Sequence, residues 1–474
     1  MTIDILPDDV LVEIFFYVNI KVPNLRNPWH VLVHVCRRWR YLVFASPRQL
    51  NLQIEYEGHR PMSEALDPWP VLPVLLRSSM VYLKSDQRCD YLVAALESEH
   101  YDHIYEIQIS NMTQSHLARF AAAMQKPFPE LTRLELSVAS QVVPVLPGSF
   151  LGGSAPRLRI LKLESIPFPS IPKLLLSAKG LVTLSLLDIS HSGYFSPDAM
   201  GTALTVMTKL KYLQLEFRSS RSHRGPESQP LPPHTRFVLP ALTTLTFHGF
   251  HDYVEDLLAR IDAPLLDYLD IGLSNDPNSD VPQLHGLISH AEEFKTFNHA
   301  IVVISPYLIR LDLYPKTEAV YYHQLFRLHI GREEWDRLIL SLAQVCSSSL
   351  FPLISALEEL KIVNDLSPDT GGWKDAPWPD LLDPFTALKN LYLSTRIASY
   401  VSRALLELSG ERIAEVLPAL QNLFIYSRYP LGSSRKAIKI FVAKRRHAGR
   451  PVSVHWELES GDWDDITDDL ASGD

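Results

Sequence analysis

The segment LTRLEL, residues 131–136, is one copy of a pattern that recurs along most of this 474-residue chain. Apolar residues occupy its first, fourth and sixth positions. Full copies begin at residues 104, 131, 158, 181, 210, 242, 266, 325, 357, 388 and 420, and a weaker copy, Phe294-Phe297-His299, lies in the widest gap. Successive copies start 23 to 32 residues apart, which is enough for one short strand and one helix. The spacing therefore predicts a repeat protein.

Repeat units of this size cannot bury their apolar faces alone, so neighbouring units must stack. Helix-like segments lie between the copies, at residues 115–124, 254–261, 335–345 and 400–408. The Leu-x-x-Leu-x-Leu core and its spacing resemble irregular leucine-rich repeats. The resemblance implies an α/β solenoid with a parallel sheet on its concave side, which we assign to residues 51–456. The alternative is a doubly wound α/β enzyme, but the short, leucine-led strands lack the Gly-rich phosphate loop of such enzymes.

Some segments depart from the repeat. Residues 301–304 and 308–313 fit the pattern only out of register, so the irregular segment 294–330 contains either an inserted hairpin or an extra strand pair. Before the first copy, residues 50–54 and 80–83 read as strands and residues 70–78 as a short helix. These expectations rest on hydrophobic periodicity alone.

Polar segments and the C-terminal end complete the predicted repeat region. Long loops are expected at residues 219–233, 275–281 and 366–379. A helix over residues 434–447 and a last strand over residues 452–456 follow the final copy. The tail, residues 457–474, has eight acidic residues and no basic residue, and we expect it to be disordered.

Residues 1–50 are expected to form a separate helical module. The segment LPDDVLVEIF, residues 6–15, opens with Pro7 and two acidic residues, which favour a helix N-terminus. Its apolar residues are expected on one face. In VLVHVCRRWRYL, residues 31–42, the apolar residues Leu32, Val35, Cys36, Trp39 and Leu42 recur at helical spacing. Both segments therefore read as amphipathic helices.

Together these two segments resemble an F-box, the three-helix module that binds the Skp-type adaptor of cullin-RING ubiquitin ligases. The resemblance lies in the Leu-Pro opening and the later Val-Cys-x-x-Trp block, and it covers residues 4–50. It implies that nine residues make or support the adaptor contact: Leu6, Pro7, Val10, Leu11, Ile14, Phe15, Val35, Cys36 and Trp39. The alternative is an N-terminal helical cap whose apolar faces turn towards the solenoid.

Composition and motifs favour protein partners. The formal net charge of −9 argues against a general binder of nucleic acid or anionic membranes. Three dispersed cysteines fit a reducing compartment, and no targeting or membrane-spanning pattern is apparent, so we expect an intracellular protein, cytoplasmic or nuclear or both. Searches for catalytic, metal-binding and phosphate-binding motifs find none, so we expect no catalytic residues, cofactor or metal site.

The strands offer a candidate surface for a protein target. Residues beside the buried leucines point to the opposite face of the sheet, because strand side chains alternate. Among them, the candidate target-binding residues are Tyr212, Tyr268, Asn390, Tyr392, Asn422, Phe424 and Tyr426. Tyr392 and Phe424 hold equivalent positions in consecutive copies and should be neighbours. Two readings stay open: an exposed aromatic hot spot, or rings buried beneath the C-terminal segment.

The sequence leads to one main functional hypothesis. It predicts a non-catalytic substrate-recognition subunit of an SCF-type ubiquitin ligase, whose F-box binds the Skp-type adaptor, and through it a cullin, while the repeats bind a protein target. The alternative is a leucine-rich-repeat interaction scaffold unconnected with ubiquitin, in which the N-terminal helices only cap the solenoid. A hydrolase or transferase would instead require clustered titratable groups in a deep pocket.

Overall fold

The computed structural model describes most of the chain, in two compact units, residues 1–210 and 211–474, which are treated separately below. The described residues are 5–21, 29–47, 49–50, 52–66, 72–81, 85–140, 143–218, 236–274, 281–291, 294, 297–305, 308–315, 325–331, 337–364, 376–408, 412–426 and 432–457. The predicted acidic tail, apart from Glu457, lies outside them, as do most of the three predicted loops.

The first unit begins with helices and continues as alternating strands and helices. Its helices are α1 (Asp8–Lys21), α2 (Trp29–Val33), α3 (Arg37–Ala45), α4 (Met62–Leu66), α5 (Ser85–Glu97), α6 (Gln114–Ala123), α7 (Ile171–Leu175) and α8 (Pro197–Leu204). Its strands are β1 (Ile54–Tyr56), β2 (Val74–Ser79), β3 (Ile104–Met112), β4 (Arg133–Val138), β5 (Ile160–Glu164) and β6 (Thr183–Ile189). Short 3₁₀ turns are η2 (Tyr101–His103), η3 (Phe150–Gly153) and η4 (His191–Gly193).

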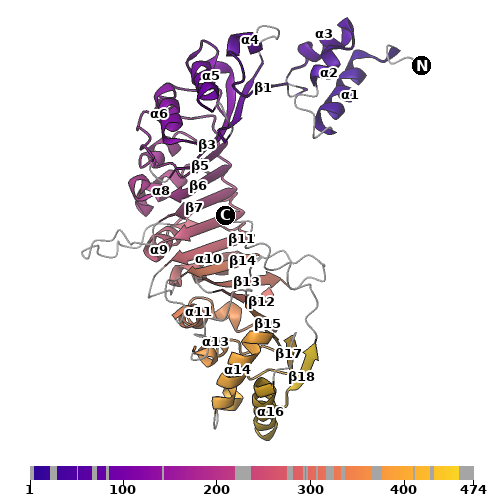
Figure 1. Cartoon of the computed structure of the whole chain (residues 1–474), viewed down its shortest axis with the longest axis vertical. Coiled ribbons are helices and arrows are strands. Elements are labelled where there is room, and N and C mark those ends of the chain that lie inside the picture. The colour runs from indigo at the N-terminus through magenta and orange to yellow at the C-terminus, as the bar shows by residue number, and fades with distance from the viewer. Residues whose placement is uncertain are drawn as a thin grey trace. The chain divides into compact units, whose positions relative to one another are not determined.

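The strands of the first unit form a parallel sheet in chain order, β1-β2-β3-β4-β5-β6. Helices α5, α6 and α8 lie along one side of this sheet, as Figure 1 shows. The leucines of the repeated pattern point towards that side and are buried, so each strand–helix unit shares its core with the next. The arrangement follows from the sequence pattern, because one strand face is consistently apolar.

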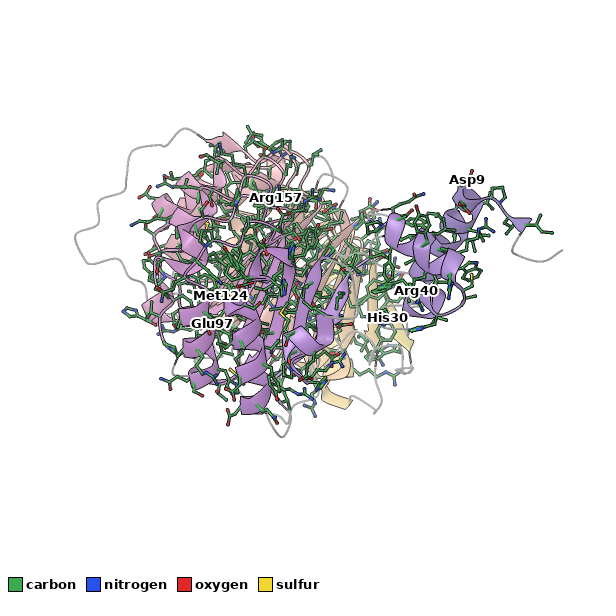
Figure 2. The ribbon with its side chains drawn as sticks, turned by 90° about the horizontal axis from the view of Figure 1, so that it is seen from above. Asp9, His30, Arg40, Glu97, Met124 and Arg157 are labelled. Atoms are coloured by element: carbon green, nitrogen blue, oxygen red, sulfur yellow. The ribbon has the colours of Figure 1, made fainter. Side chains whose placement is uncertain are left out.

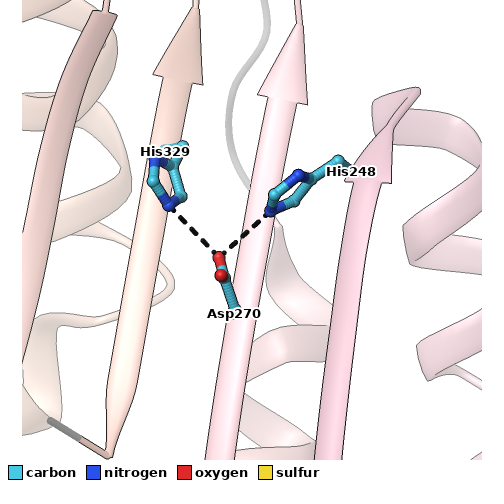
Figure 3. Close-up of side chains that lie close together, drawn as sticks. All are labelled: His248, Asp270 and His329. Carbon is cyan, nitrogen blue, oxygen red and sulfur yellow. Dashed lines mark hydrogen bonds and ion pairs between the residues drawn. The ribbon is translucent and has the colours of Figure 1, made fainter. Parts of the chain in front are cut away.

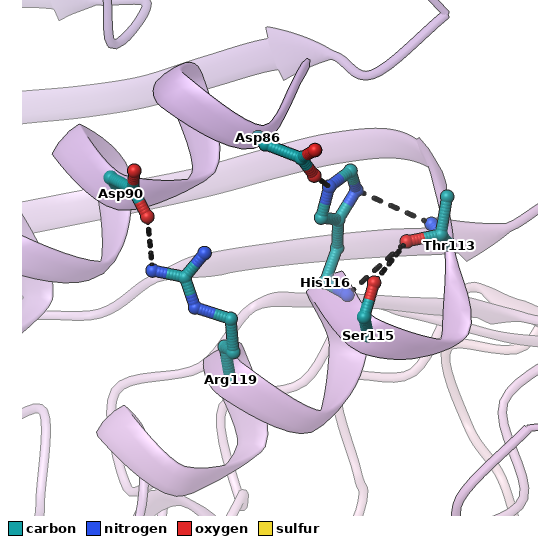
Figure 4. Close-up of polar contacts among 6 residues, drawn as sticks. All are labelled: Asp86, Asp90, Thr113, Ser115, His116 and Arg119. Carbon is teal, nitrogen blue, oxygen red and sulfur yellow. Dashed lines mark hydrogen bonds and ion pairs between the residues drawn. The ribbon is translucent and has the colours of Figure 1, made fainter. Parts of the chain in front are cut away.

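A polar contact fixes helix α6 against helix α5 (Figure 4). Thr113 caps α6 by accepting a hydrogen bond from the backbone N–H of His116 (3.3 Å), and the backbone N–H of Thr113 donates to Nδ1 of His116 (3.4 Å). Since Nδ1 accepts, Nε2 carries the hydrogen that it shares with Asp86 Oδ1 at 2.8 Å. Arg119 and Asp90 form a second ion pair between the two helices. The buried His116 ring is thus satisfied on both nitrogens.

The second unit continues the alternation. Its strands are β7 (Tyr212–Phe217), β8 (Phe237–Val238), β9 (Thr244–Gly249), β10 (Ile261–Asp262), β11 (Tyr268–Ser274), β12 (Phe297–Ile304), β13 (Leu308–Pro315), β14 (Phe326–Gly331), β15 (Glu359–Asn364), β16 (Asn390–Ser394), β17 (Asn422–Tyr426) and β18 (Ser453–Glu457). Its helices are α9 (His251–Leu258), α10 (Pro282–His290), α11 (Leu338–Ser347), α12 (Phe351–Ile354), α13 (Trp378–Leu382), α14 (Thr395–Glu407), α15 (Arg412–Glu415) and α16 (Gly432–His447).

The main sheet of the second unit has the order β7-β9-β11-β14-β13-β12-β15-β16-β17-β18, while β8 and β10 pair separately. Among its described strands, β13 alone runs antiparallel to its neighbours. Its helices contact one another along the unit, α9 with α10, α11 with α13, α13 with α14 and α14 with α16. Both units are therefore mixed α/β structures built on largely parallel sheets.

The irregular segment is an antiparallel insertion of three strands. β12 and β13 form a hairpin, β13 pairs antiparallel with β14, and the outer two strands pair parallel with β15 and β11. At its centre Asp312 is fully buried, with Oδ1 2.9 Å from Arg327 Nε and Oδ2 2.9 Å from Arg310 Nε. The first pair is a hydrogen-bonded ion pair, whereas the second has the distance of an ion pair without hydrogen-bond geometry.

Most predicted elements are present. All first, fourth and sixth positions of the full pattern copies are buried except Leu325, which is half-buried. The helices expected at residues 115–124, 254–261, 335–345, 400–408 and 434–447 are observed with shifted ends. The last strand, β18, is also confirmed. The weaker copy at Phe294 lies in a different frame, because Ala300 rather than Phe297 pairs with Leu360.

Other expectations are wrong. Residues 74–78, predicted as the end of a helix, belong to strand β2, because the run Val74-Leu75-Leu76 is buried between two paired strands. A short apolar run does not by itself distinguish these two states. The predicted strands at 50–54 and 80–83 are also misplaced: β1 begins at Ile54, and Met80 and Val81 form a turn. The last two residues of the third predicted loop, Trp378 and Pro379, begin helix α13.

The segment 31–42 is two helices rather than one. Helix α2 ends at Val33, a turn follows, and Cys36 caps α3, its Sγ accepting from the backbone N–H of Trp39 at 3.5 Å. The break removes Val35 and Cys36 from the expected apolar stripe, and both are exposed. Among the described residues, no helix has the length and apolar character needed to cross a membrane.

Candidate binding surfaces

The three N-terminal helices share a small apolar core. Leu11, Phe15, Trp29 and Val43 are buried in it, and the ring of Trp39 lies 4.7 Å from that of Phe15. Arg38 links α3 to the start of α1, donating to the carbonyl oxygen of Leu6 (2.6 Å) and to Asp8 Oδ1 (2.6 Å). These contacts bring the first turn of α3 against the beginning of α1.

The nine predicted adaptor-contact residues fall into three groups. Leu11 and Phe15 are buried in the core and can only support a contact; Leu6, Ile14 and Trp39 are half-buried; Pro7, Val10, Val35 and Cys36 are exposed. Further apolar side chains on these helices are exposed, including Phe16, Tyr17, Val31 and Tyr41. Polar residues such as Asp9 and Arg40 lie among them on the helical surface (Figure 2). The helices therefore expose apolar groups that their own core does not use.

At the C-terminal end of the second unit, three rings stack across three parallel strands. Tyr392 of β16, Phe424 of β17 and His455 of β18 are in register. The ring centroids are 4.5 Å and 4.7 Å apart, with interplanar angles of 11° and 17°. These separations match the spacing of neighbouring strands. We call Tyr392, Phe424 and His455 the aromatic ladder.

The aromatic ladder answers the question left open by the sequence. The described part of the C-terminal segment does not cover the rings; it adds β18 beside β17 and extends the stack by one ring. Tyr392, Phe424 and Tyr426 are half-buried, and His455 is exposed. The ring of Tyr426 lies 6.3 Å from that of Tyr392. The predicted neighbours are therefore brought together with part of their surface accessible.

A row of polar residues runs from β17 and β16, two positions before the rings of the aromatic ladder, onto the neighbouring strands β15 and β12. Asn422 Nδ2 donates to Asn390 Oδ1 (2.9 Å), and Asn390 Nδ2 donates to Glu359 Oε1 (3.1 Å). His299 Nδ1 lies 3.3 Å from Glu359 Oε2. Asn390 and Asn422, both predicted to bind the target, thus also stabilise strand pairing. Ladders of this kind are typical of parallel, in-register strands.

The end of helix α16 is held by its basic residues. The guanidinium of Arg445 is buried and donates to the carbonyl oxygens of Ile413 (2.8 Å) and Leu417 (3.1 Å). Burial lowers the pKa of Arg445. Lys444 Nζ donates to the carbonyl oxygens of Leu406 (2.8 Å) and Leu408 (3.0 Å). These cations have a structural role: they fix α16 to the preceding helices.

Tyr212 and Tyr268 lie elsewhere in the second unit. Both pair with Thr244 of the strand between them, and Tyr212 is exposed. Tyr268 is half-buried and donates a long hydrogen bond to Asp270 Oδ2 (3.4 Å). Burial and the Asp270 charge raise the pKa of Tyr268 to about 12. The seven predicted target-binding residues therefore do not form one cluster: five belong to the C-terminal strands and two to β7 and β11.

Next to Tyr268 lies a cluster that no sequence motif predicts (Figure 3). His248 of β9 and His329 of β14 both direct Nε2 at Oδ1 of Asp270, on the strand between them, at 3.3 Å each. Asp270 is buried, and the two histidines are half-buried. Each of the three residues offers one atom of a kind that binds metal ions, and these three atoms lie within 4.8 Å of one another.

The charges in this cluster stabilise one another. Burial disfavours the charged carboxylate of Asp270, but hydrogen bonds from His248 and His329 outweigh it and lower the pKa of Asp270. Burial likewise opposes protonation of His248, yet the hydrogen bond and charge of Asp270, with a contribution from Glu216, raise its pKa. The cluster therefore favours an ionised carboxylate facing at least one protonated imidazole or another cation.

In the first unit, a cavity of about 440 Å³ lies at the carboxyl ends of the strands. Its charged groups belong to a row of side chains that pair with one another. Arg77 Nε donates to Gln108 Oε1 (3.0 Å), and Lys162 Nζ lies 3.4 Å from Glu135 Oε1. The cavity is open and its two basic side chains, Arg77 and Lys162, both have polar partners, so its geometry does not point to a particular reaction.

Comparison with known proteins adds no relative. A scan against models of protein families found no match, and a search of curated proteins found no significant match. The argument for function therefore rests on the residues and their geometry. The sequence reasoning did not predict that His248 belongs to a candidate site. The alternation of side chains along β9 could have indicated it, because His248 lies two residues after Thr246 and therefore on the same face of the strand.

Proposed function

We propose that this chain is the substrate-recognition subunit of an SCF-type ubiquitin ligase. In this proposal residues 1–50 form an F-box that binds a Skp-type adaptor, and through it a cullin. Residues 51–456 form a leucine-rich-repeat-like solenoid that binds a protein target. The chain carries no catalytic step; it raises the effective concentration of target lysines near a ubiquitin-conjugating enzyme held elsewhere in the complex. Such a complex would act inside the cell.

One observation carries the proposal: the N-terminal helices expose apolar side chains that their own core leaves unused. Val35 is 55% exposed and Tyr41 is 72% exposed, although both belong to a segment with a well-formed core. Exposed apolar groups collected on a small helical module are typical of a surface that binds another protein. The resemblance of the Leu-Pro and Val-Cys-x-x-Trp motifs to those of an F-box supports the Skp-type adaptor as that protein.

The repeat region supports the second half of the proposal. Its strands present side chains on the face opposite the leucine core, and in the second unit these include the aromatic ladder and Tyr426. Rigid aromatic rings contribute large contact areas at low entropic cost, which makes them frequent hot spots. We place the target contact on this group, with the polar row of Asn390 and Asn422 beside it.

A second reading is also favoured by a specific contact. The core of the N-terminal helices continues into Leu52, Ile54 and Leu72, at the beginning of the first sheet. Helices packed in this way would also serve as a cap in an interaction scaffold unconnected with ubiquitin. The two readings differ in one respect, because only an F-box binds the adaptor.

The test is a binding measurement with purified chain and a purified Skp-type adaptor. Val35→Asp places a carboxylate on the exposed helical surface without touching the core, and we expect it to weaken adaptor binding by about 30-fold or more, as for loss of a hot-spot contact of about 2 kcal/mol. The matched control is Leu265→Asp, at an equally apolar position that is 60% exposed in the second unit. It should bind like the wild type.

The outcomes separate the two readings. Tight binding by the wild type, weakened by Val35→Asp and unaffected by Leu265→Asp, supports the F-box. No measurable binding of the wild-type chain, or equal binding by all three proteins, would remove the ligase proposal and leave the scaffold.

A further inference from the structure

We propose that His248, Asp270 and His329 bind a divalent transition-metal ion of the zinc type, through Nε2 of each imidazole and Oδ1 of the carboxylate. The inference is independent of the ligase proposal, since it concerns only the second unit. It assigns a binding site to the outward face of the sheet, beside the predicted target-binding residue Tyr268.

The distances fit the ion. Zinc binds imidazole nitrogen and carboxylate oxygen at about 2.0–2.2 Å, so neighbouring ligand atoms in a tetrahedral site are about 3.3–3.5 Å apart. Each Nε2 lies 3.3 Å from Asp270 Oδ1, and the two nitrogens are within 4.8 Å of each other. Two of the three ligand–ligand edges are therefore already formed. A small rotation of the imidazoles closes the third.

The same distances fit a hydrogen-bonded cluster less well. A charged N–H···O⁻ bond is normally about 2.7–2.9 Å long, whereas both contacts to Asp270 Oδ1 are 3.3 Å. In addition, both imidazoles approach the same oxygen rather than one oxygen each. Two nitrogens and one oxygen that converge at the long end of the hydrogen-bond range also fit a shared central ion.

The sheet preorganises the three ligands. In the strand register Gly272 of β11 lies level with both His248 and His329, and Asp270 is two residues earlier on the same face. A Cβ atom at Gly272 would lie 2.6 Å from Cδ2 of His248. Glycine at this position therefore leaves the space in which the His248 ring turns towards Asp270. No rearrangement of the backbone is needed to assemble the site.

The charged groups near Asp270 leave its carboxylate able to bind a metal ion. Arg327, level with Asp270 on β14, and Arg310 on β13 both pair with the buried Asp312. Tyr268 donates to Oδ2 of Asp270 and so orients the carboxylate with Oδ1 towards the imidazoles. Glu216, level with His248 on β7, adds negative charge. Such outer contacts are common around protein metal sites.

The donor set selects the class of ion. Two imidazoles and one carboxylate suit zinc and related transition metals, whereas magnesium and calcium prefer oxygen ligands throughout. Three protein ligands leave at least one position of a tetrahedral ion open. Because His248 and His329 are only half-buried, that position is accessible from outside the sheet. Water or a side chain of a bound protein could occupy it.

The experiment uses the full chain without an affinity tag, treated with a chelator and then freed of it. Isothermal titration with Zn²⁺ should show one site per chain that is lost in a His248→Gln and His329→Gln double variant, with affinity reduced at least about a hundredfold. Titration with Co²⁺ should give the visible absorption of a nitrogen- and oxygen-bound ion, and Mg²⁺ should not compete. Circular dichroism checks that the double variant is folded.

The matched control is His59→Gln. His59 lies 2.8 Å from Glu57 on the surface of the first unit and does not belong to the proposed ligand set, so this variant should bind Zn²⁺ like the wild type. Gly272→Ala provides an independent test, because it keeps all three ligands but crowds His248; its affinity should fall about tenfold or more. A wild-type chain that binds no Zn²⁺, or a double variant with unchanged affinity, would overturn the inference.

Discussion

The strongest prediction for stability concerns Asp312, the buried carboxylate at the centre of the three-strand insertion. Asp312→Asn keeps the shape of the side chain but removes its charge, leaving Arg310 and Arg327 without an anionic partner on β13. Each guanidinium nitrogen lies 2.9 Å from one carboxylate oxygen. The substitution therefore tests how far the insertion depends on this charge.

The magnitude follows from two opposing effects. A charge pair separated by about 4 Å contributes about 4 kcal/mol at an effective dielectric constant of 20, so two pairs contribute about 8 kcal/mol. Burying the carboxylate costs several kcal/mol, which the asparagine avoids. The net loss is about 3–5 kcal/mol, as for other buried pairs from which one partner is removed. This is a large part of the stability of an ordinary domain.

Native-state hydrogen–deuterium exchange with mass spectrometry can measure this loss locally. In peptides from β12, β13 and β14, the free energy of the opening that permits exchange should fall by about 3–5 kcal/mol. The exchange of peptides from β3 to β6 should be unchanged. The control is Glu407→Gln, which breaks the exposed Arg403–Glu407 pair on α14 and should change stability by at most about 0.5 kcal/mol. If β13 were as well protected from exchange in Asp312→Asn as in the wild type, the reasoning would be refuted.

Three further predictions concern other contacts of the second unit. Phe424→Ala removes the middle ring of the aromatic ladder and should destabilise β16–β18 by about 1–3 kcal/mol, measured by hydrogen exchange; a loss below 0.5 kcal/mol would mean that the stack contributes little. Arg445→Met removes the guanidinium hydrogen bonds to the carbonyl oxygens of Ile413 and Leu417 and should make α16 a preferred site of limited proteolysis; wild-type resistance would contradict this. In the metal-free chain, the raised pKa of His248 means that the folded state binds more protons than the unfolded state. The contribution of protonated His248 to stability is therefore complete below pH 6.5 and is lost as the pH rises through the pKa of His248 in the folded state. Asp270, whose pKa is lowered, contributes throughout this pH region, so the urea midpoint should fall as the pH rises above 6.5, and by less in His248→Gln.

The repeat pattern predicted the core of the molecule well. Copies such as Leu131-Leu134-Leu136 and Leu388-Leu391-Leu393 are buried as expected. Their leucines lie on one face of the strand, and the apolar core lies on that face of the sheet. Tyr392 and Phe424 were correctly predicted to be neighbours for the same reason: equivalent residues of parallel, in-register strands lie side by side. The third ring, His455, could not be predicted from the pattern, because β18 does not carry a full copy.

The cluster around Asp270 depended on information that the pattern does not contain. Aligning the copies places Leu328 level with Leu269, but in the structure Leu328 pairs with Ile271. This two-residue shift moves His329 from the level of Asp270 to that of Gly272, opposite His248. The shift arises where β14 enters the sheet through the antiparallel insertion. Register there is set by pairing with β13 as well as β11.

The insertion also determines the order in which the second unit can fold. From β15 to β18 each strand pairs with the next strand along the chain, so this part of the sheet can grow one strand at a time. At β11 the partner strand is β14, and two other strands intervene in the chain. Addition of strands to the sheet must wait here until the hairpin of β12 and β13 has formed and placed β14 beside β11. Closing such a long loop costs entropy, which is offset only by contacts that form later. This junction is therefore the place where refolding should be slowest.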